Sequence, residues 1–499
     1  MSHFSWIDGS IVGLYLLATM VAGLSVRKYV GKVEHFLIAG REMDVYLGVA
    51  SLAATEFGIV TCMSAAQLGY DNGFAGATVG ITYGAAMFLV GYTGFCVKPL
   101  RDSGVVTIAE LFEKKFGPRI RWLSGLVIVL GGLLNMGIFL RQGGEFLVLV
   151  CGMSPGRLEI TMTILLCGVA IYTMAGGMLS VLITDYLQFI VMSIGLLAVT
   201  FLLMAEIPWT TMVDTVRDKY GEAGFNPLVN PNLGWSYIVF NSLLNVAVAI
   251  TWQTTVARLL SAKDTKTGQR VYTATSFFFV CQFLIPAVWG IAALATLEPG
   301  VIPIGGNTAN AMPIYLSRTV PLGLMGLLVA GMLAADMSTD SAYMLTWGSV
   351  IYNDLLAPFR HGRWSEKRGL LWNRAIIALI GVFLLIYGLW YEIQDGIWTY
   401  LTITGTIYLS SMATLLVACC YWPRANNWGA AGAILVGATF PLAYLVLQKL
   451  PATQELAKSI GPNYSGIAAF VGAAAAMIVG SLAKDLILGT PRLGDADGR

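Results

Sequence analysis

The chain has 499 residues, of which 57% are apolar and only 12% are charged. An ordinary soluble protein is about 25% charged, so the composition excludes a soluble globular chain and indicates a polytopic helical membrane protein. The net charge of +2 favours no class of partner, and the sequence contains no basic patch for nucleic acid. The seven cysteines include no C-x-x-C pair, so neither a disulfide framework nor a cysteine metal site is indicated.

Apolar runs of helix length predict thirteen transmembrane segments. In chain order they cover residues 6–26, 45–70, 75–97, 122–151, 158–174, 178–205, 233–257, 271–296, 320–352, 375–391, 396–420, 428–447 and 464–483. The longest loop on the predicted outer side, about 206–232, carries Pro208, Trp209 and Pro227, and we expect a short helix within it.

Lysine and arginine are unevenly divided between the two sides that these segments define. With the N-terminus outside, 23 of the 30 fall on the cytoplasmic side, Arg258 among them, and six fall on the outer side. Because positive residues favour cytoplasmic loops, the count predicts a multi-pass protein of the cell membrane with its N-terminus outside and its C-terminus in the cytoplasm.

The fourth segment contains the one remaining basic residue, Arg141, with Gln142 beside it and Glu145 one helical turn further on. Arg141 and Glu145 have the spacing of an internal salt bridge that stabilises a helix facing protein. The alternative is that Arg141 binds a substrate carboxylate through its planar guanidinium, with Gln142 and Glu145 completing polar recognition. The sequence leaves both interpretations open.

The ninth segment carries hydroxyls and carboxylates where a lipid-facing helix has none. Ala335, Ser338 and Thr339 are spaced i, i+3, i+4, so a backbone carbonyl and two hydroxyls share one helix face. Such hard oxygen ligands suit a small hard cation, although hydroxyls also join helices by hydrogen bonds. Asp336 and Asp340 in the same stretch favour a functional role, because acids within the membrane are expensive.

Six short motifs occur in chain order at matching membrane positions. They are EHFLIAGR at 34–41, SLAATEFG at 51–58, TMAGG at 173–177 with TDYLQ at 184–188, RLLSAKD at 258–264, AADMST at 334–339 and YWPRANNWGA at 421–430. With these motifs the chain resembles the sodium/solute symporter family over about residues 8–440. Members of that family carry sugars, proline, pantothenate, short monocarboxylates or sialic acid.

The resemblance implies an all-α fold built on two five-helix inverted repeats. The repeats would occupy residues 45–205 and 233–420 of a transport core at 45–420. Residues 1–44 would form a first helix with its cytoplasmic loop, and residues 421–499 two C-terminal helices and a short tail. The first helix of each repeat is expected to be interrupted near the membrane midplane, here near 54–58 and 249–255.

The resemblance also implies a sodium site made of five neutral oxygens. They are the backbone carbonyls of Ala54, Phe57 and Ala335 and the hydroxyls of Ser338 and Thr339. Neutral dipoles are chemically sensible here, because they hold sodium weakly enough to release it inside.

Some relatives have a second sodium site, and Asp185, Ser338 and Ser341 match parts of it. Ala342 stands where a hydroxyl is expected, which leaves the second ion undecided. Asp336 and Asp340 replace apolar residues of the family pattern. They are candidates for an extra cation charge or for proton carriers.

The expected solute-binding residues outside the fourth segment lie near the helix breaks and on the eleventh segment. Glu56 stands next to the sodium site, where other members often have a polar or acidic residue. Trp252 offers an aromatic wall, with core packing as the alternative, and Gln253 a hydrogen-bond partner. Thr402 presents a hydroxyl to the cavity or to another helix.

The sequence therefore predicts sodium-coupled symport of a small polar organic solute by alternating access, with sodium as the co-transported ion. Whether the solute carries a carboxylate depends on the role of Arg141. Proton coupling and a transporter-like sensor are the alternatives. An enzyme is disfavoured because no nucleophile and base are paired at one depth, and beyond the lipid bilayer no obligatory protein partner is indicated.

Overall fold

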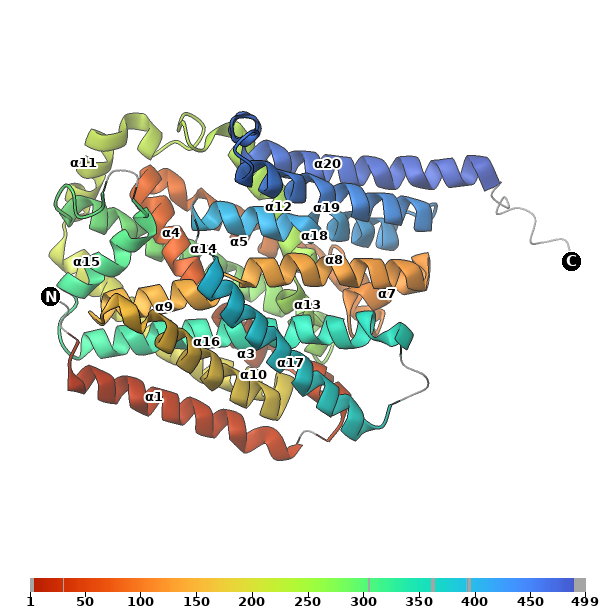
Figure 1. Cartoon of the computed structure of the whole chain (residues 1–499), viewed down its shortest axis with the longest axis horizontal. Coiled ribbons are helices and arrows are strands. Elements are labelled where there is room, and N and C mark those ends of the chain that lie inside the picture. Colours follow the sequence, from red (N-terminus) through yellow and green to blue (C-terminus); the bar gives the residue numbers. More distant parts are fainter. Residues whose placement is uncertain are drawn as a thin grey trace, which may run out of the picture.

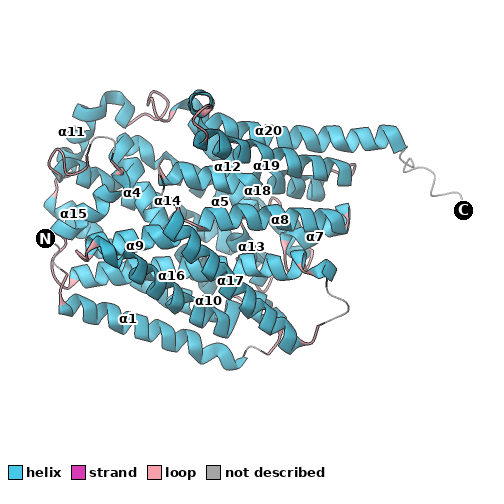
Figure 2. Cartoon of the chain, in the orientation of Figure 1, coloured by secondary structure: helices cyan, strands magenta, loops and turns pink. Residues whose placement is uncertain are grey.

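The computed structural model of the chain describes residues 4–29, 31–303, 306–359, 364–391, 393 and 396–488. Apart from an isolated β-bridge between Met43 and Ala262, these residues form helices joined by loops and turns (Figure 2). The predicted all-α class is therefore confirmed.

The α-helices of the described residues are numbered in chain order. They are α1 (Trp6–Ser25), α2 (Val33–Ile38), α3 (Val45–Glu56), α4 (Ile59–Asn72), α5 (Thr78–Thr93), α6 (Val97–Asp102), α7 (Ile108–Phe116), α8 (Pro118–Met136), α9 (Phe139–Val150), α10 (Leu158–Glu206), α11 (Trp209–Tyr220), α12 (Gly234–Thr251), α13 (Gln253–Ser261), α14 (Thr265–Thr296), α15 (Ala311–Thr319), α16 (Leu324–Val350), α17 (Glu366–Trp390), α18 (Ile397–Tyr421), α19 (Asn427–Lys449) and α20 (Gln454–Leu488).

Each of the thirteen predicted segments overlaps a helix, and α11 is the short helix expected between 206 and 232. Ten helical stretches of the described residues, some of them with a break, are long and apolar enough to cross a membrane. α16 is not among them, because its polar residues lower its hydropathy. The number of crossings thus remains a prediction.

Two segments differ from the predicted outline. The segment at 122–151 is two helices, α8 and α9, with a break at residues 137–138. The segments at 158–174 and 178–205 are one long helix, α10, with a kink at Gly177, whose φ is +53°. A Cβ atom at Gly177 would lie 2.4 Å from the carbonyl oxygen of Phe36, so this bend requires glycine.

The long helices lie side by side, with α1 and α20 at opposite edges of the bundle and α16 between them (Figure 1). α16 packs against α10, α1, α3 and α8. Every residue from Leu328 to Val350 is buried, so the polar residues of this helix contact protein and not lipid.

Both predicted helix interruptions are present. α3 ends at Glu56 and α4 begins at Ile59, with Gly58 in an extended conformation. α12 ends at Thr251 and α13 begins at Gln253, with Trp252 extended between them. Interrupted helices expose backbone groups inside a membrane protein only where these groups are buried in protein or line a cavity, so the two breaks mark a candidate functional centre.

Candidate functional site

The first break lies directly against α16. The hydroxyl of Thr339 lies 2.8 Å from the carbonyl oxygen of Thr55 and 3.0 Å from that of Ala335. Gly58 permits this close approach, because a Cβ atom at that position would lie only 2.9 Å from the Thr339 hydroxyl oxygen. The contact partner on α3 is thus Thr55, between the predicted ligands Ala54 and Phe57, which are both buried.

Ser338 turns from Thr339 toward α10. Its hydroxyl donates to Asp185 Oδ1 at 2.6 Å. The other carboxylate oxygen of Asp185 accepts from Ser51 at 2.5 Å and from Arg258 Nη2 at 3.0 Å. The same guanidinium donates to Thr55 Oγ1 at 2.6 Å, and the Asp185 and Arg258 side chains are both fully buried. One network therefore joins α3, α10, α13 and α16.

A central cavity of about 80 Å³ lies beside the two breaks. Its polar lining consists of Glu56, Thr61, Asn135, Asn245, Gln282 and Thr402. Its aromatic lining consists of Tyr83, Phe139, Trp252, Phe283, Tyr343 and Trp398. The walls therefore combine flat apolar rings with amide and hydroxyl groups, which is the usual chemistry of a site for a small polar molecule.

Glu56 joins the two interrupted helices across this cavity. Its Oε1 accepts a short hydrogen bond from the hydroxyl of Thr254 and lies 3.5 Å from that of Thr255, at the start of α13. Glu56 is the only charged residue of the lining, all of which belongs to the described part of the chain. The cavity therefore presents an acidic acceptor and no cationic side chain.

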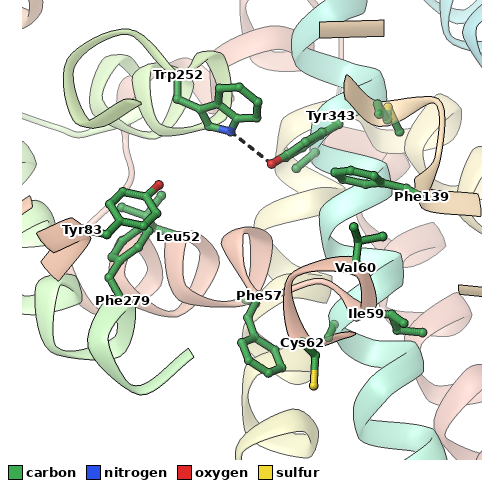
Figure 3. Packing of buried hydrophobic residues seen from close by; sticks show 14 of the residues in the cluster. Leu52, Phe57, Ile59, Val60, Cys62, Tyr83, Phe139, Trp252, Phe279 and Tyr343 are labelled. Carbon is green, nitrogen blue, oxygen red and sulfur yellow. Dashed lines mark hydrogen bonds between the residues drawn. The ribbon is translucent and has the colours of Figure 1, made fainter. Parts of the chain in front are cut away.

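Aromatic side chains close one side of the cavity. The indole N–H of Trp252 donates to the Tyr343 hydroxyl at 3.1 Å, and Phe139 lies beside the Tyr343 ring (Figure 3). Trp347 and Tyr408 pack behind them, with ring centroids 5.8–5.9 Å from that of Trp252. Rings at these separations are in contact, so this wall must rearrange before a solute can pass through it.

A sequence profile of the sodium:solute symporter family matches residues 36–437. The chain belongs to this family. Sodium/glucose cotransporter 4 of Danio rerio is 25% identical to this symporter over 480 residues, covering 88% of the chain and 72% of the relative. The high-affinity choline transporter 1 of Drosophila melanogaster is 24% identical over 443 residues, covering 87% and 70%.

The fold is shared with solved transporters. A substrate-bound, outward-open Na⁺-coupled sialic acid symporter aligns with a TM-score of 0.81 at 18% identity, covering 96% of this chain and 98% of that one. A nucleobase-cation-symport-1 family transporter aligns with a TM-score of 0.57 at 16% identity. These alignments confirm the inverted-repeat fold predicted from the sequence.

Family membership establishes the general function. The chain is a multi-pass membrane transporter that couples sodium to the symport of a small solute, and it is not an enzyme. Neither a proton-coupled symporter nor a sensor is favoured by these relatives.

The structure places the predicted solute residues of this symporter in three locations. Glu56, Trp252 and Thr402 line the central cavity. Gln253 lines a separate void between α13 and α16, and its amide donates to the carbonyl of Thr251 at 3.3 Å. The remaining three, Arg141, Gln142 and Glu145, lie on α9 and line neither of these two cavities.

Arg141 of the symporter contacts α17. Its Nε lies 2.8 Å from Glu145 Oε1, and its Nη1 donates to the carbonyl of Gly388 at 3.3 Å. Gln142 donates to the second oxygen of Glu145 at 3.1 Å. This geometry matches the salt-bridge interpretation of the pair.

Arg258 requires a correction. The residue count placed it among the cytoplasmic cations, whereas its guanidinium is fully buried against Asp185. Ser341, predicted to share a cation with Asp185, donates to the carbonyl of Ser338 on its own helix at 3.1 Å, and its role at a cation stays a prediction. The polar cavity residues Asn135, Asn245 and Gln282 were not predicted, because helical spacing alone does not tell which neighbour a polar face meets.

Proposed function

We propose that this symporter binds one sodium ion where the break between α3 and α4 meets α16, and that its solute is an uncharged or cationic polar molecule held in the central cavity. The observation that carries the solute proposal is the lining of that cavity, in which Glu56 is the sole charged side chain.

The proposed sodium ligands are the five oxygens implied by the family resemblance, from Ala54, Phe57, Ala335, Ser338 and Thr339. Support comes from the approach of the Thr339 hydroxyl to the end of α3, 2.8 Å from the Thr55 carbonyl. A hydroxyl and carbonyls that meet at the end of a broken helix are hard neutral ligands with unpaired oxygen lone pairs.

One ion, not two, is proposed because Arg258 already supplies a positive charge at Asp185. Both carboxylate oxygens of Asp185 are engaged, one by Ser338 and the other by Ser51 and Arg258. A second sodium at Asp185 would bring another cation next to a buried guanidinium, which like-charge repulsion disfavours.

The proposed solute presents hydroxyl or amino donors to Glu56 and the cavity amides while its apolar faces contact Trp252 and Phe139. A free carboxylate is disfavoured, since it would be desolvated beside Glu56 with no cationic partner. Two of the solutes named for the relatives above, glucose and choline, are a neutral polyol and a cation and support this class, whereas the third, sialic acid, carries a carboxylate.

A thermal-shift screen of the purified protein tests this class. In sodium, a hexose, polyol or amine ligand at about 100 times its dissociation constant should stabilise the protein by roughly 2.7 kcal/mol. Glu56→Gln should weaken that ligand by roughly tenfold or more, because a hydrogen bond to a charged group is lost.

The matched control is the double variant Arg141→Gln with Glu145→Gln, which should bind the same ligand with unchanged affinity. If a carboxylate is the tightest-binding ligand and Arg141→Lys weakens its binding, then Arg141 binds the solute and the proposed solute class is wrong.

We also propose that the N-terminus lies outside the cell membrane and the C-terminus in the cytoplasm, with repeat boundaries at 45–205 and 233–420. Without the buried Arg258, 22 lysines and arginines still fall on the cytoplasmic side against six outside. In a cysteine-free background, Asp214→Cys should react with an impermeant thiol reagent on intact cells, whereas Lys263→Cys should react only after permeabilisation. The opposite labelling would reverse the topology.

A further inference from the structure

We infer that the apolar cavity between α3, α10 and α14 binds an acyl chain of a membrane phospholipid, and that the bound chain steadies the α3–α4 break and so raises the affinity for sodium. The second half of this inference rests on the sodium site proposed above. The first half stands on the cavity alone.

The lateral cavity, as we call it, has a volume of about 170 Å³ and is lined by residues of α3, α10 and α14. α3 packs against both of the other helices. Among the lining residues, Ala53, Phe57 and Leu196 are at most 7% exposed, whereas Leu197 is 45% and Phe277 68% exposed. The cavity therefore opens on the outer surface of the bundle and extends inward as far as the first helix break.

The lining of the lateral cavity is apolar. Among the described residues that form it, none is charged, and only Ser193 and Gln282 carry a side-chain nitrogen or oxygen. Phe189 of α10 and Phe278 of α14 meet edge to face across it, with ring centroids 5.3 Å apart. A polar ligand would lose its hydrogen bonds to water here and find few replacements, so the lining selects a hydrocarbon.

The depth of the lateral cavity identifies its occupant. Cys281 of the lining lies near the middle of α14, roughly 23 Å from either end of the helix. The hydrocarbon core of a bilayer is about 30 Å thick, so the cavity opens near the bilayer centre. Next to its mouth, Ile190, Ile194 and Leu284 continue the apolar surface and are 42–54% exposed. Lipid acyl chains are what surrounds a protein at this depth.

A chain end in the lateral cavity gains van der Waals contacts with the surrounding side chains, and these contacts hold it more firmly than a flat helix surface would. A lipid head group stays at the membrane surface, so only the tail of the phospholipid enters. The expected ligand is therefore one acyl chain of a phospholipid that remains anchored in the bilayer.

The lateral cavity lies directly behind the proposed sodium site. Phe57, whose carbonyl is a proposed sodium ligand, lines the lateral cavity and not the central one, and its ring points away from Trp252 and Tyr343 (Figure 3). Ala53 lines it from the preceding turn of α3. A chain in this space opposes a shift of the end of α3, which keeps the Phe57 carbonyl in place for sodium. Such coupling is reciprocal, so sodium should also strengthen binding of the chain.

Photo-crosslinking tests the site. The full chain is placed in nanodiscs with a phosphatidylcholine that carries a diazirine near the end of one acyl chain, and the labelled peptides are identified by mass spectrometry. Labelling of residues 189–197 and 277–285 should saturate as the fraction of photoreactive lipid rises. Labelling around Leu435, an exposed residue of α19 outside the lateral cavity, should rise in proportion to that fraction.

Variants that fill the lateral cavity make the test specific. Ser193→Trp places an indole within the cavity and should abolish the saturable labelling. Ile194→Trp adds the same ring at the neighbouring lipid-facing position, outside the lining, and should leave it unchanged. If Ser193→Trp does not fold, Cys281→Phe fills the cavity from the opposite wall.

Three results would overturn the acyl-chain site. They are labelling of 189–197 and 277–285 that never saturates, saturable labelling that survives in the filled variant, and saturable labelling by a photoreactive sterol but not by the phospholipid. Crosslinks from these segments to a second copy of the chain would likewise show that protein and not lipid covers the cavity.

Sodium titrations of the purified protein test the linkage. In delipidated protein, added phosphatidylcholine should lower the sodium concentration for half-maximal thermal stabilisation by roughly fivefold or more. Ser193→Trp should show the lipid-loaded value with or without phospholipid, and Ile194→Trp should respond like the parent protein. A parent protein whose sodium affinity ignores phospholipid overturns the linkage. Unchanged sodium affinity in Thr339→Ala would instead reject the sodium site while leaving the crosslinking result standing.

Discussion

Replacing Thr339 with alanine is expected to raise the sodium concentration for half-maximal uptake by roughly tenfold or more. The change removes one of five proposed sodium oxygens and the group that lies 2.8 Å from the Thr55 carbonyl. A lost ligand and an unsatisfied buried carbonyl together cost about 1–3 kcal/mol. Ser338→Ala should have a similar effect, and the double variant a larger one. Uptake driven by a sodium gradient without a pH gradient measures the sodium dependence of each variant.

Thr346→Ala is the matched control for this experiment. Thr346 is also a buried threonine of α16, but its hydroxyl bonds only to carbonyls of its own helix, at Ala342 and Tyr343. Its loss should leave the sodium dependence unchanged. A Ser338→Ala, Thr339→Ala double variant that keeps the parent's sodium dependence would reject this site.

The face that Ala335, Ser338 and Thr339 share could be predicted from sequence, because helical spacing fixes which side chains lie together. The partner of each hydroxyl could not be predicted in this way. Ser338 donates to Asp185, 153 residues earlier in the chain, while Thr339 reaches the end of α3. Those partners depend on how α16 packs against α10 and α3.

The positions of the two helix breaks were also only partly predictable from the sequence. The first has a local signal in Gly58, whose missing side chain permits the close approach of Thr339. The second falls at Trp252, a residue with no intrinsic tendency to interrupt a helix. Its position was predictable only through the family resemblance, because no local residue signals it; in the structure the Trp252 indole donates a hydrogen bond to Tyr343.

Single charged residues were the hardest to place. Both Arg141 and Arg258 lie in or beside apolar segments. The sequence left Arg141 open between a salt bridge and a substrate-binding role, and it put Arg258 at the membrane surface. The structure has Arg141 on the α17 side of α9 and Arg258 in the centre, paired with a residue 73 positions away. Residue counts treat every arginine as solvated, so they cannot recognise one that is neutralised by a distant carboxylate.

Breaking the pair of Asp185 and Arg258 is expected to be the most damaging single change outside the sodium ligands. Either Asp185→Asn or Arg258→Gln leaves a fully buried charge without its partner, and such changes typically cost about 3–5 kcal/mol. The thermal midpoint in detergent should fall clearly in both variants. The double variant should recover part of the loss, because no unpaired buried charge remains, and a double-mutant cycle measures that coupling.

The same variants distinguish two roles of Asp185: a permanent ion pair with Arg258, or a ligand of a second sodium ion. If Arg258 is the permanent partner of Asp185, the double variant should retain the steepness of the parent's sodium dependence, since only one ion ever bound. Strictly additive losses of stability would show that the two charges do not stabilise each other. A folded Asp185→Asn variant with a shallower sodium dependence would instead assign Asp185 to a second ion. The expected result is strong coupling in stability with an unchanged steepness, because every oxygen of Asp185 is already held by Ser338, Ser51 or Arg258.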